Sequence, residues 1–147
     1  MKVREILSRK SLSLVTVPPE SLVGTVIDLL LRHNIGAVPV VSREGKLMGI
    51  FGERDVLRGL RQHGSPLTQM EVRQVMQRDL PTCETDSSVL ELMNRMTRDR
   101  LRHVMVLEEG RLVGIVSVGD LVKNRLDQLE TEANILRDYV IAARARS

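Results

Sequence analysis

A repeated stretch of seven residues constrains the fold of this chain more strongly than any other feature. The sequence GIFGERD at residues 49–55 returns as GIVSVGD at residues 114–120, 65 positions later. An apolar, β-branched run leads into the second copy and apolar residues at helical spacing follow it, which predicts a buried strand that turns directly into a helix. The neighbouring elements repeat in the same order. A period this long that occurs twice indicates a tandem duplication rather than a solenoid.

Each copy is predicted to contain a strand, a helix, a hairpin of two short strands and a second helix. The expected ranges in the first copy are a strand over 12–17, a helix over 21–34, strands over 38–41 and 47–51, and a helix from 54. Those in the second copy are a strand over 80–83, a helix capped by Ser87 or Ser88, strands over 104–107 and 112–116, and a helix from 118. Short amphipathic turns at 3–7 and 72–76 precede the two copies. The predicted fold class is α/β, more narrowly α+β, with two β-α-β-β-α repeats at 1–66 and 71–127.

The strand-to-helix turn of the second copy has the chemistry of half a nucleotide site. Ser117 falls at the predicted N-cap, where its hydroxyl and the free N–H groups of the first helical turn point the same way. Such a corner suits a phosphate. The carboxylate of Asp120 only accepts hydrogen bonds, so it can bind two neighbouring hydroxyls of a ribose. The Ser-x-x-Asp spacing is also that of a capping box, which only begins a helix, and this alternative stays open.

The last helix is predicted to extend over 118–144 and to outrun its own domain beyond Asp127. Its apolar residues are spaced by alternating steps of four and three, which is the seam of a coiled coil over three heptads. The seam consists of Val122, Leu126, Leu129, Ala133, Leu136, Val140 and Ala143. Because such a seam has to be covered, we expect a homodimer through residues 122–143.

Composition argues against several classes of function. Aromatic residues make up 1% of the chain and the net charge is only +3, which disfavours stacking platforms and basic stripes for nucleic acid. Cys83 has no partner for a disulfide and fits a reducing compartment. Without a signal peptide or a long apolar run, we expect a soluble cytoplasmic protein. No histidines or cysteines share a metal-ligand spacing, so we expect no metal. No sequence feature supplies the base and oxyanion site that Cys83 would need as a nucleophile, so we expect no enzyme.

Together these motifs resemble a tandem CBS-domain pair, named for cystathionine β-synthase, and in particular the small stand-alone bacterial proteins of that family. The resemblance covers about residues 3–126 and rests on both Gly-hydrophobic-x-(Ser/Thr)-x-x-Asp turns, on LRHVMVL at 101–107 and on GIVSVGDLVK at 114–123. It implies that the two repeats pack through their sheets around a pseudo-twofold axis. It also implies two clefts that bind adenosine ligands such as AMP, ADP, ATP, NAD(H) or S-adenosylmethionine, and we expect an AMP-like ligand here.

The resemblance implies a role for each residue of the main cleft. Asp120 would hold the ribose and Ser117 the phosphate, with Arg102 and His103 as further phosphate ligands. Small and aliphatic groups would line the adenine slot, since such groups can sandwich a purine. They are Ile115 from the motif and Thr16, Val17, Ile35 and Ala37 from the other repeat. Plain core positions are the alternative for these wall residues.

The first copy departs from the family pattern at its phosphate contacts. Gly52 stands where the family has Ser or Thr, and Gly36-Ala37 stands where the second copy has Arg102-His103. A hydrogen bond to a charged group contributes about 1.5–3 kcal/mol. The Asp55 cleft is therefore predicted to bind weakly or to take a ligand without phosphate, with Arg54 as a partial substitute.

These observations predict a ligand-sensing regulatory module without catalytic activity, acting on a protein that the sequence does not identify. Two alternatives stay open. One is a purely structural dimerisation module whose clefts are empty. The other is a nucleic-acid-binding protein that uses the arginines of the C-terminal tail, Arg137, Arg144 and Arg146.

Overall fold

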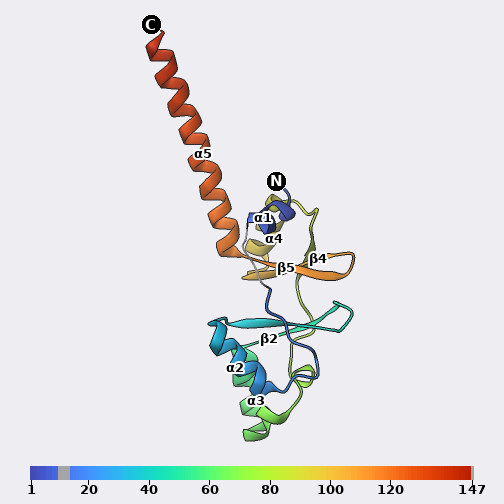
Figure 1. Ribbon diagram of the computed structural model, residues 1–147. Helices are drawn as coiled ribbons and strands as arrows, with labels where there is room; N and C mark the ends of the chain where they lie inside the picture. Colours follow the sequence, from blue (N-terminus) through green and yellow to red (C-terminus); the bar gives the residue numbers. More distant parts are fainter. Residues whose placement is uncertain (10–13, 147) are drawn as a thin grey trace.

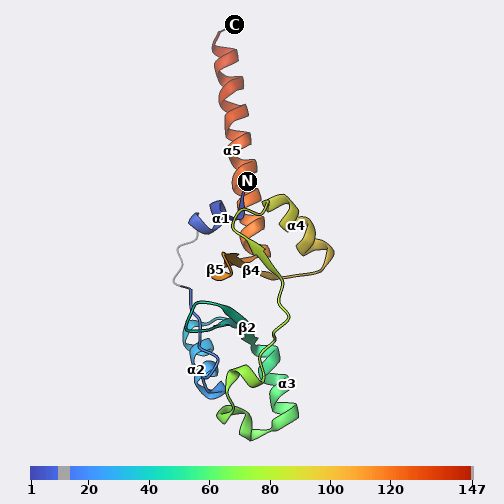
Figure 2. The same ribbon diagram turned by 90° about the vertical axis from the view of Figure 1, so that its right-hand side faces the viewer.

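The chain forms two lobes and one long projecting helix (Figure 1). The computed structural model describes residues 1–9 and 14–146. Each lobe contains one small sheet, and the two sheets face each other across the middle of the molecule with the helices on the outer sides (Figures 1 and 2). This arrangement confirms the predicted α+β architecture of two repeats that pack through their sheets.

The first lobe is built from the first repeat. Its elements are α2 (Val23–His33), β1 (Ala37–Val41), β2 (Leu47–Gly52), α3 (Glu53–His63) and the 3-10 turns η1 (Ser65–Gln69) and η2 (Val72–Gln74). Strands β1 and β2 pair as an antiparallel hairpin. Helix α2 ends at Asn34, which adopts the left-handed conformation with φ 50°, as the helix C-terminus predicted near this residue requires.

The strand predicted over 12–17 is wrong in its described part. Residues 12 and 13 lie outside the described residues, and within 14–17 only Val17 pairs, through a single parallel bridge to Val40. The backbone N–H of Val17 donates to Pro39 O at 3.1 Å. Pro18 and Pro19 follow immediately and lack the N–H that a longer ladder needs.

The second lobe has a three-stranded sheet. Its elements are α1 (Val3–Arg9), β3 (Thr82–Glu84), α4 (Val89–Arg98), β4 (His103–Glu108) and β5 (Arg111–Ser117). Strand β3 runs parallel to β4, and β4 pairs with β5 as an antiparallel hairpin. Of the two predicted caps of α4, the structure selects Ser88, whose Oγ accepts the N–H of Glu91.

The two repeats exchange their opening segments. Val3 and Ile6 of α1 lie in the core of the second lobe, and the Val3 N–H donates to Ser87 O at 3.0 Å. The sequence-based division, which grouped α1 with residues 1–66, therefore differs from the packing. In turn, Val72 and Met76 lie in the core of the first lobe. Sequence periodicity identified the apolar side of each segment but not the lobe that buries it.

The first glycine of each repeated motif makes room for the exchanged segment. A Cβ at Gly114 would lie 2.6 Å from Leu7 Cδ2, and a Cβ at Gly49 would lie 2.5 Å from the backbone oxygen of Gln77. Gln77 is also fixed against β2, because it exchanges backbone hydrogen bonds with Ile50 at 2.9 Å in both directions. Residues with side chains do not allow such close approach.

Helix α5 (Val118–Ala145) begins in the second lobe and then leaves it (Figure 1). Leu121 and Asn124 are its buried residues, and Asn124 Oδ1 accepts from Arg9 Nη1 at 3.4 Å. Every residue from Leu129 to Arg146 is exposed. The prediction that the helix outruns the domain beyond Asp127 is confirmed.

Candidate functional site

The sheet faces between the lobes are defined by the alternation of side chains along each strand. Val38 and Val40 point into the core of the first lobe, and Val104 and Val106 into that of the second. Pro39 and Met105 therefore point toward the opposite lobe. Both are nearly inaccessible, with Met105 2% exposed and Pro39 below 2%, although neither belongs to the core of its own lobe. The two sheets thus cover each other here.

The predicted site turn lies at the rim of this inter-lobe face. On β4 and β5, His103 pairs with Ser117, and Met105 pairs with Ile115. Because partners in an antiparallel pair share a face, these four side chains lie on the inter-lobe side. Ile115, predicted as a wall of the adenine slot, is half-buried there.

Ser117 and Asp120 form a reciprocal capping box at the start of α5. Ser117 Oγ accepts the N–H of Asp120 at 3.1 Å, and Asp120 Oδ2 accepts the N–H of Ser117 at 2.8 Å. The cap that sequence reasoning left as an alternative is therefore present. It does not exclude a ligand, since a hydroxyl that accepts one bond still has a proton to donate and a carboxylate has about four acceptor positions.

Arg102 and His103 lie beside this turn, as predicted. Arg102 O accepts the N–H of Val118 at 3.0 Å, and both side chains are exposed. The structure thus brings together a hydroxyl, a carboxylate, a guanidinium and an imidazole at one sheet edge. This set can bind an anion next to a polyhydroxyl group.

In the corresponding turn of the first lobe, the motif carboxylate is more buried and is already paired with a cationic side chain. Asp55 is 6% exposed, its Oδ2 accepts the N–H of Gly52 at 2.9 Å, and its Oδ1 pairs with Arg58 Nη1 at 3.1 Å. Burial raises the pKa of the Asp55 carboxyl above its usual value, outweighing the Gly52 N–H and Arg58, which lower it. Arg54, the predicted substitute ligand, is exposed. The carboxylate of this lobe is thus less available than that of Asp120, which is half-buried.

The stability contributed by Asp55 is expected to depend on pH. Because the pKa of the folded state lies above the unfolded value near 3.8, the folded protein holds this proton more tightly. Stability relative to Asp55→Asn should therefore fall as the pH rises from 3.8 through the raised pKa, and then stay constant. Melting temperatures of both proteins between pH 3.5 and 7 measure this difference. An increase with pH would show that the Arg58 pair outweighs burial.

Gly52 is required by close packing, which explains why the first motif lacks a hydroxyl. A Cβ at Gly52 would lie 2.8 Å from Gly36 O and 3.1 Å from Ala37 Cβ. Glu53 N–H donates to the same Gly36 oxygen at 3.1 Å, so that backbone is held in place. The glycine at position 52 therefore has a structural reason, which is close packing, in addition to its chemical consequence, which is the missing hydroxyl.

Gly52→Ser is accordingly expected to destabilise the protein without creating a phosphate site. Forcing a side chain into this contact should cost about 1–3 kcal/mol. Chemical denaturation measures the loss, and titration with AMP measures the number of sites. A variant as stable as the wild type that binds one more nucleotide would contradict this expectation.

The four wall residues predicted from the first repeat do not share one environment. The side chain of Val17 lies in the first core, which favours its structural alternative. Ile35 packs against that core as well, which favours its structural alternative. Alternation with Val38 along β1 places Ala37 on the inter-lobe side, where it is half-buried, and Thr16 is exposed.

Sequence reasoning missed Pro39 and Met105 as inter-lobe residues. Their signal was present, since each is flanked by two valines in the sequences VPV at 38–40 and VMV at 104–106. Period-two alternation would have assigned the valines to the cores and the middle residue to the other face.

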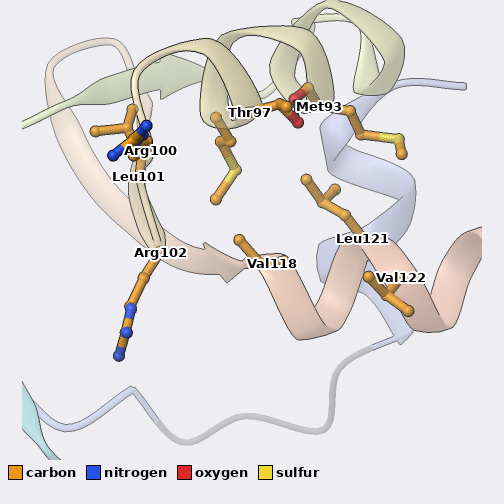
Figure 3. A pocket seen from close by; sticks show the side chains of 9 residues that line it. Met93, Thr97, Arg100, Leu101, Arg102, Val118, Leu121 and Val122 are labelled. Carbon is orange, nitrogen blue, oxygen red and sulfur yellow. Dashed lines mark hydrogen bonds between the residues drawn. The ribbon is translucent and has the colours of Figure 1, made fainter.

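A cavity of about 370 Å³ lies elsewhere, between α4 and the start of α5. Its wall is formed mainly by apolar side chains, including Met93, Leu121 and Val122, with Arg100 and Arg102 at one end (Figure 3). The Arg102 side chain points away from Leu121 and Val122 (Figure 3). Of the predicted site residues only Arg102 borders this cavity, so it is not the predicted cleft.

Other candidate chemistry is weak in the part of the chain that the structure describes. Cys83 is buried, and burial raises the pKa of its thiol to about 11, which makes it a poor nucleophile. Residues 1–9 and 14–146 contain no cluster of three His, Cys, Asp or Glu side chains that could hold a metal. Among the described helices, none is long and apolar enough to span a membrane.

Comparison with known proteins places the two repeats in one family. The family model of the CBS domain matches residues 3–62 and 72–127. The solved structure of a CBS-domain containing protein from Agrobacterium tumefaciens is 40% identical, with a TM-score of 0.73 over 84% of this chain and 92% of that chain.

Two curated relatives extend the comparison. A CBS domain-containing protein of Bacillus subtilis is 31% identical over 111 residues, which are 76% of this chain and 78% of that protein. A mitochondrial CBS domain-containing protein of Arabidopsis thaliana is 31% identical over 118 residues, which are 78% of this chain and 57% of that protein. The chain therefore spans little more than half the length of the Arabidopsis relative.

Proposed function

The chain belongs to the CBS-domain family as a tandem pair, and we propose that it is a non-catalytic regulatory module that binds an AMP-like adenosine nucleotide between its lobes. The observation that supports this most directly is the group at the end of β5. Ser117 and Asp120 lie at the helix start, His103 begins the adjacent strand β4, and Arg102 lies immediately before it. A phosphate would accept from Ser117, Arg102 and His103, and the ribose would donate to Asp120.

The inter-lobe position of this group supports a role in sensing. A ligand held by the turn of the second lobe, with its base against the sheet of the first, would contact both lobes. Such a ligand changes the angle between the lobes only if it binds one arrangement more tightly than the other. The regulated partner would respond to that angle.

Calorimetric titration of nucleotide-stripped protein with AMP, ATP, NADH and S-adenosylmethionine tests the proposal. We expect one ligand to saturate a single strong site per chain. Absence of heat from all four ligands up to millimolar concentration would leave the capping box as the whole role of Ser117 and Asp120.

That outcome would favour the second candidate function, a structural dimerisation module with empty clefts. The observation in its favour is that each motif side chain already accepts the backbone N–H of the other residue. Under either function, the exposed seam of α5 supports a homodimer through residues 122–143. The single buried Cys83 supports a reducing, cytoplasmic location.

A further inference from the structure

Helix α5 has an apolar seam, and from Leu129 onward the described chain does not bury it. The five large seam residues, Val122, Leu126, Leu129, Leu136 and Val140, are between 44% and 65% exposed. The helix projects away from both lobes in two perpendicular views (Figures 1 and 2). The contact between Gln128 Nε2 and Met1 Sδ, at 3.7 Å, is close to the point where α5 leaves the lobe.

The charges beside the seam indicate which partner fits it. In heptad notation Leu126, Ala133 and Val140 are at a positions, and Val122, Leu129, Leu136 and Ala143 are at d positions. In a parallel, in-register pair of helices, each g residue faces the e residue five positions further along the partner. Arg125 would then face Glu130 of the second copy, and Glu132 would face Arg137. The third such pair, Tyr139 with Arg144, allows a cation–π contact.

Four of these charged residues, Arg125, Glu130, Glu132 and Arg137, have no opposite charge three or four positions away on their own helix. The neighbours three and four positions away from Arg125, Glu132 and Arg137 are uncharged, and Glu130 has only Asp127, of like charge. Ion pairs in the described chain join Asp55 with Arg58, Glu71 with Arg73 and Arg98 with Asp99. These charges therefore do not stabilise a single helix by pairing within it, but they complement the charges of a second copy of α5.

An antiparallel pair fits less well. Antiparallel packing places e residues opposite e residues and g residues opposite g residues. If Ala133 packs on Leu136 of the second copy, Glu130 faces Arg137 favourably, but Lys123 approaches Arg144, which repels it. The parallel, in-register arrangement makes attractive contacts throughout.

We propose that α5 pairs with α5 of a second copy as a parallel, in-register, two-stranded coiled coil over residues 122–143. This inference rests on the homodimer of the proposed function and adds its orientation and register. The layers at Leu136 and Val140 have the combination of Leu at d and a β-branched residue at a that favours two strands, although Leu126 at a and Val122 at d do not have it. The arrangement places both second lobes at the same end of the coiled coil.

Cysteine cross-linking of the full chain tests the orientation. In the parallel arrangement Ala143 lies opposite itself, so Ala143→Cys should form a disulfide-linked dimer under mild oxidation. Ala142→Cys is the matched control, because the neighbouring c position faces away from the seam. The native Cys83 is buried and can be kept, with the wild type as its control. Cross-linking of Ala143→Cys to Leu126→Cys in a mixture, without self-linking, would show an antiparallel pair and overturn the proposal.

Charge reversal tests the register. Glu132→Arg and Arg137→Glu should each weaken the dimer about tenfold in sedimentation equilibrium, and the double variant should restore wild-type affinity within about threefold. A double variant as weak as either single variant would overturn the predicted contact.

A wild-type protein that is monomeric at all concentrations would refute both the homodimer and this inference, whereas calorimetry on the same sample tests nucleotide binding separately. A trimer or tetramer would overturn the two-stranded arrangement.

Discussion

Asp120→Ala is expected to remove the strong nucleotide site, whereas Asp55→Ala is expected to leave it intact. The Asp120 carboxylate would accept two ribose hydroxyls, and each hydrogen bond to a charged group contributes about 1.5–3 kcal/mol. Loss of both should weaken binding by about a hundredfold or more. Asp55 is 6% exposed and paired with Arg58, so its removal should affect stability more than affinity. Calorimetric titration of both variants with AMP measures the difference.

The capping box requires a control for this result, because Asp120→Ala also removes a partner of the helix start. Loss of such a cap costs about 1 kcal/mol of stability, and thermal unfolding measures that loss independently of ligand. Asp120→Asn provides the matched variant, since an amide oxygen can still accept the Ser117 N–H but has no charge. Binding that survives Asp120→Ala and disappears in Asp55→Ala would assign the site to the other lobe.

Gly49→Ala is expected to be the most destabilising of the single-methyl additions to the motif turns. The new Cβ would lie 2.5 Å from Gln77 O and 2.7 Å from Met76 Sδ. The Gln77 backbone is paired with Ile50 and cannot move without breaking that bridge. Overpacking of this kind costs about 1–3 kcal/mol and occasionally more, so we expect a loss of about 3 kcal/mol in urea denaturation.

Two other glycine variants give a control and an intermediate case for the stability of Gly49→Ala. Gly36→Ala is the control, because its Cβ would have no atom within 4 Å, and its stability should stay within about 0.5 kcal/mol of the wild type. Gly114→Ala should fall between the two, since the atom that it meets is the tip of the Leu7 side chain. Wild-type stability of Gly49→Ala would show that the segment around Gln77 can shift at little cost.

Local sequence patterns predicted the elements that depend on local physics. The hairpins at 37–52 and 103–117 and the end of α2 at Asn34 follow from β-branched runs, turn residues and helical spacing. The site edge was also predictable in part, because Ser117 and Asp120 are three residues apart, and Arg102 and His103 lie at the start of the neighbouring strand, which begins at His103. Their role in binding a nucleotide stays a prediction.

Patterns within a segment could not predict which distant segment it packs against. The apolar side of α1 indicates burial, but Val3 and Ile6 would fit either core by their chemistry. The strand over 12–17 failed for a related reason, since pairing of Val17 depends on β1 rather than on its own propensity. The cap geometry of the Asp55 turn depends on the approach of Gly36 to Gly52, which no local rule specifies.

The exchange of α1 has a consequence for the order in which the protein folds during synthesis. The first lobe is built from residues that follow one another from Val17 to Gln77, so it can fold as soon as they leave the ribosome. The core of the second lobe joins Val3 to residues as distant as Val116 and Leu121. Closing a loop of that length costs entropy and slows folding. The apolar side of α1 in the nascent chain therefore stays without its core until the residues up to Leu121 have been translated.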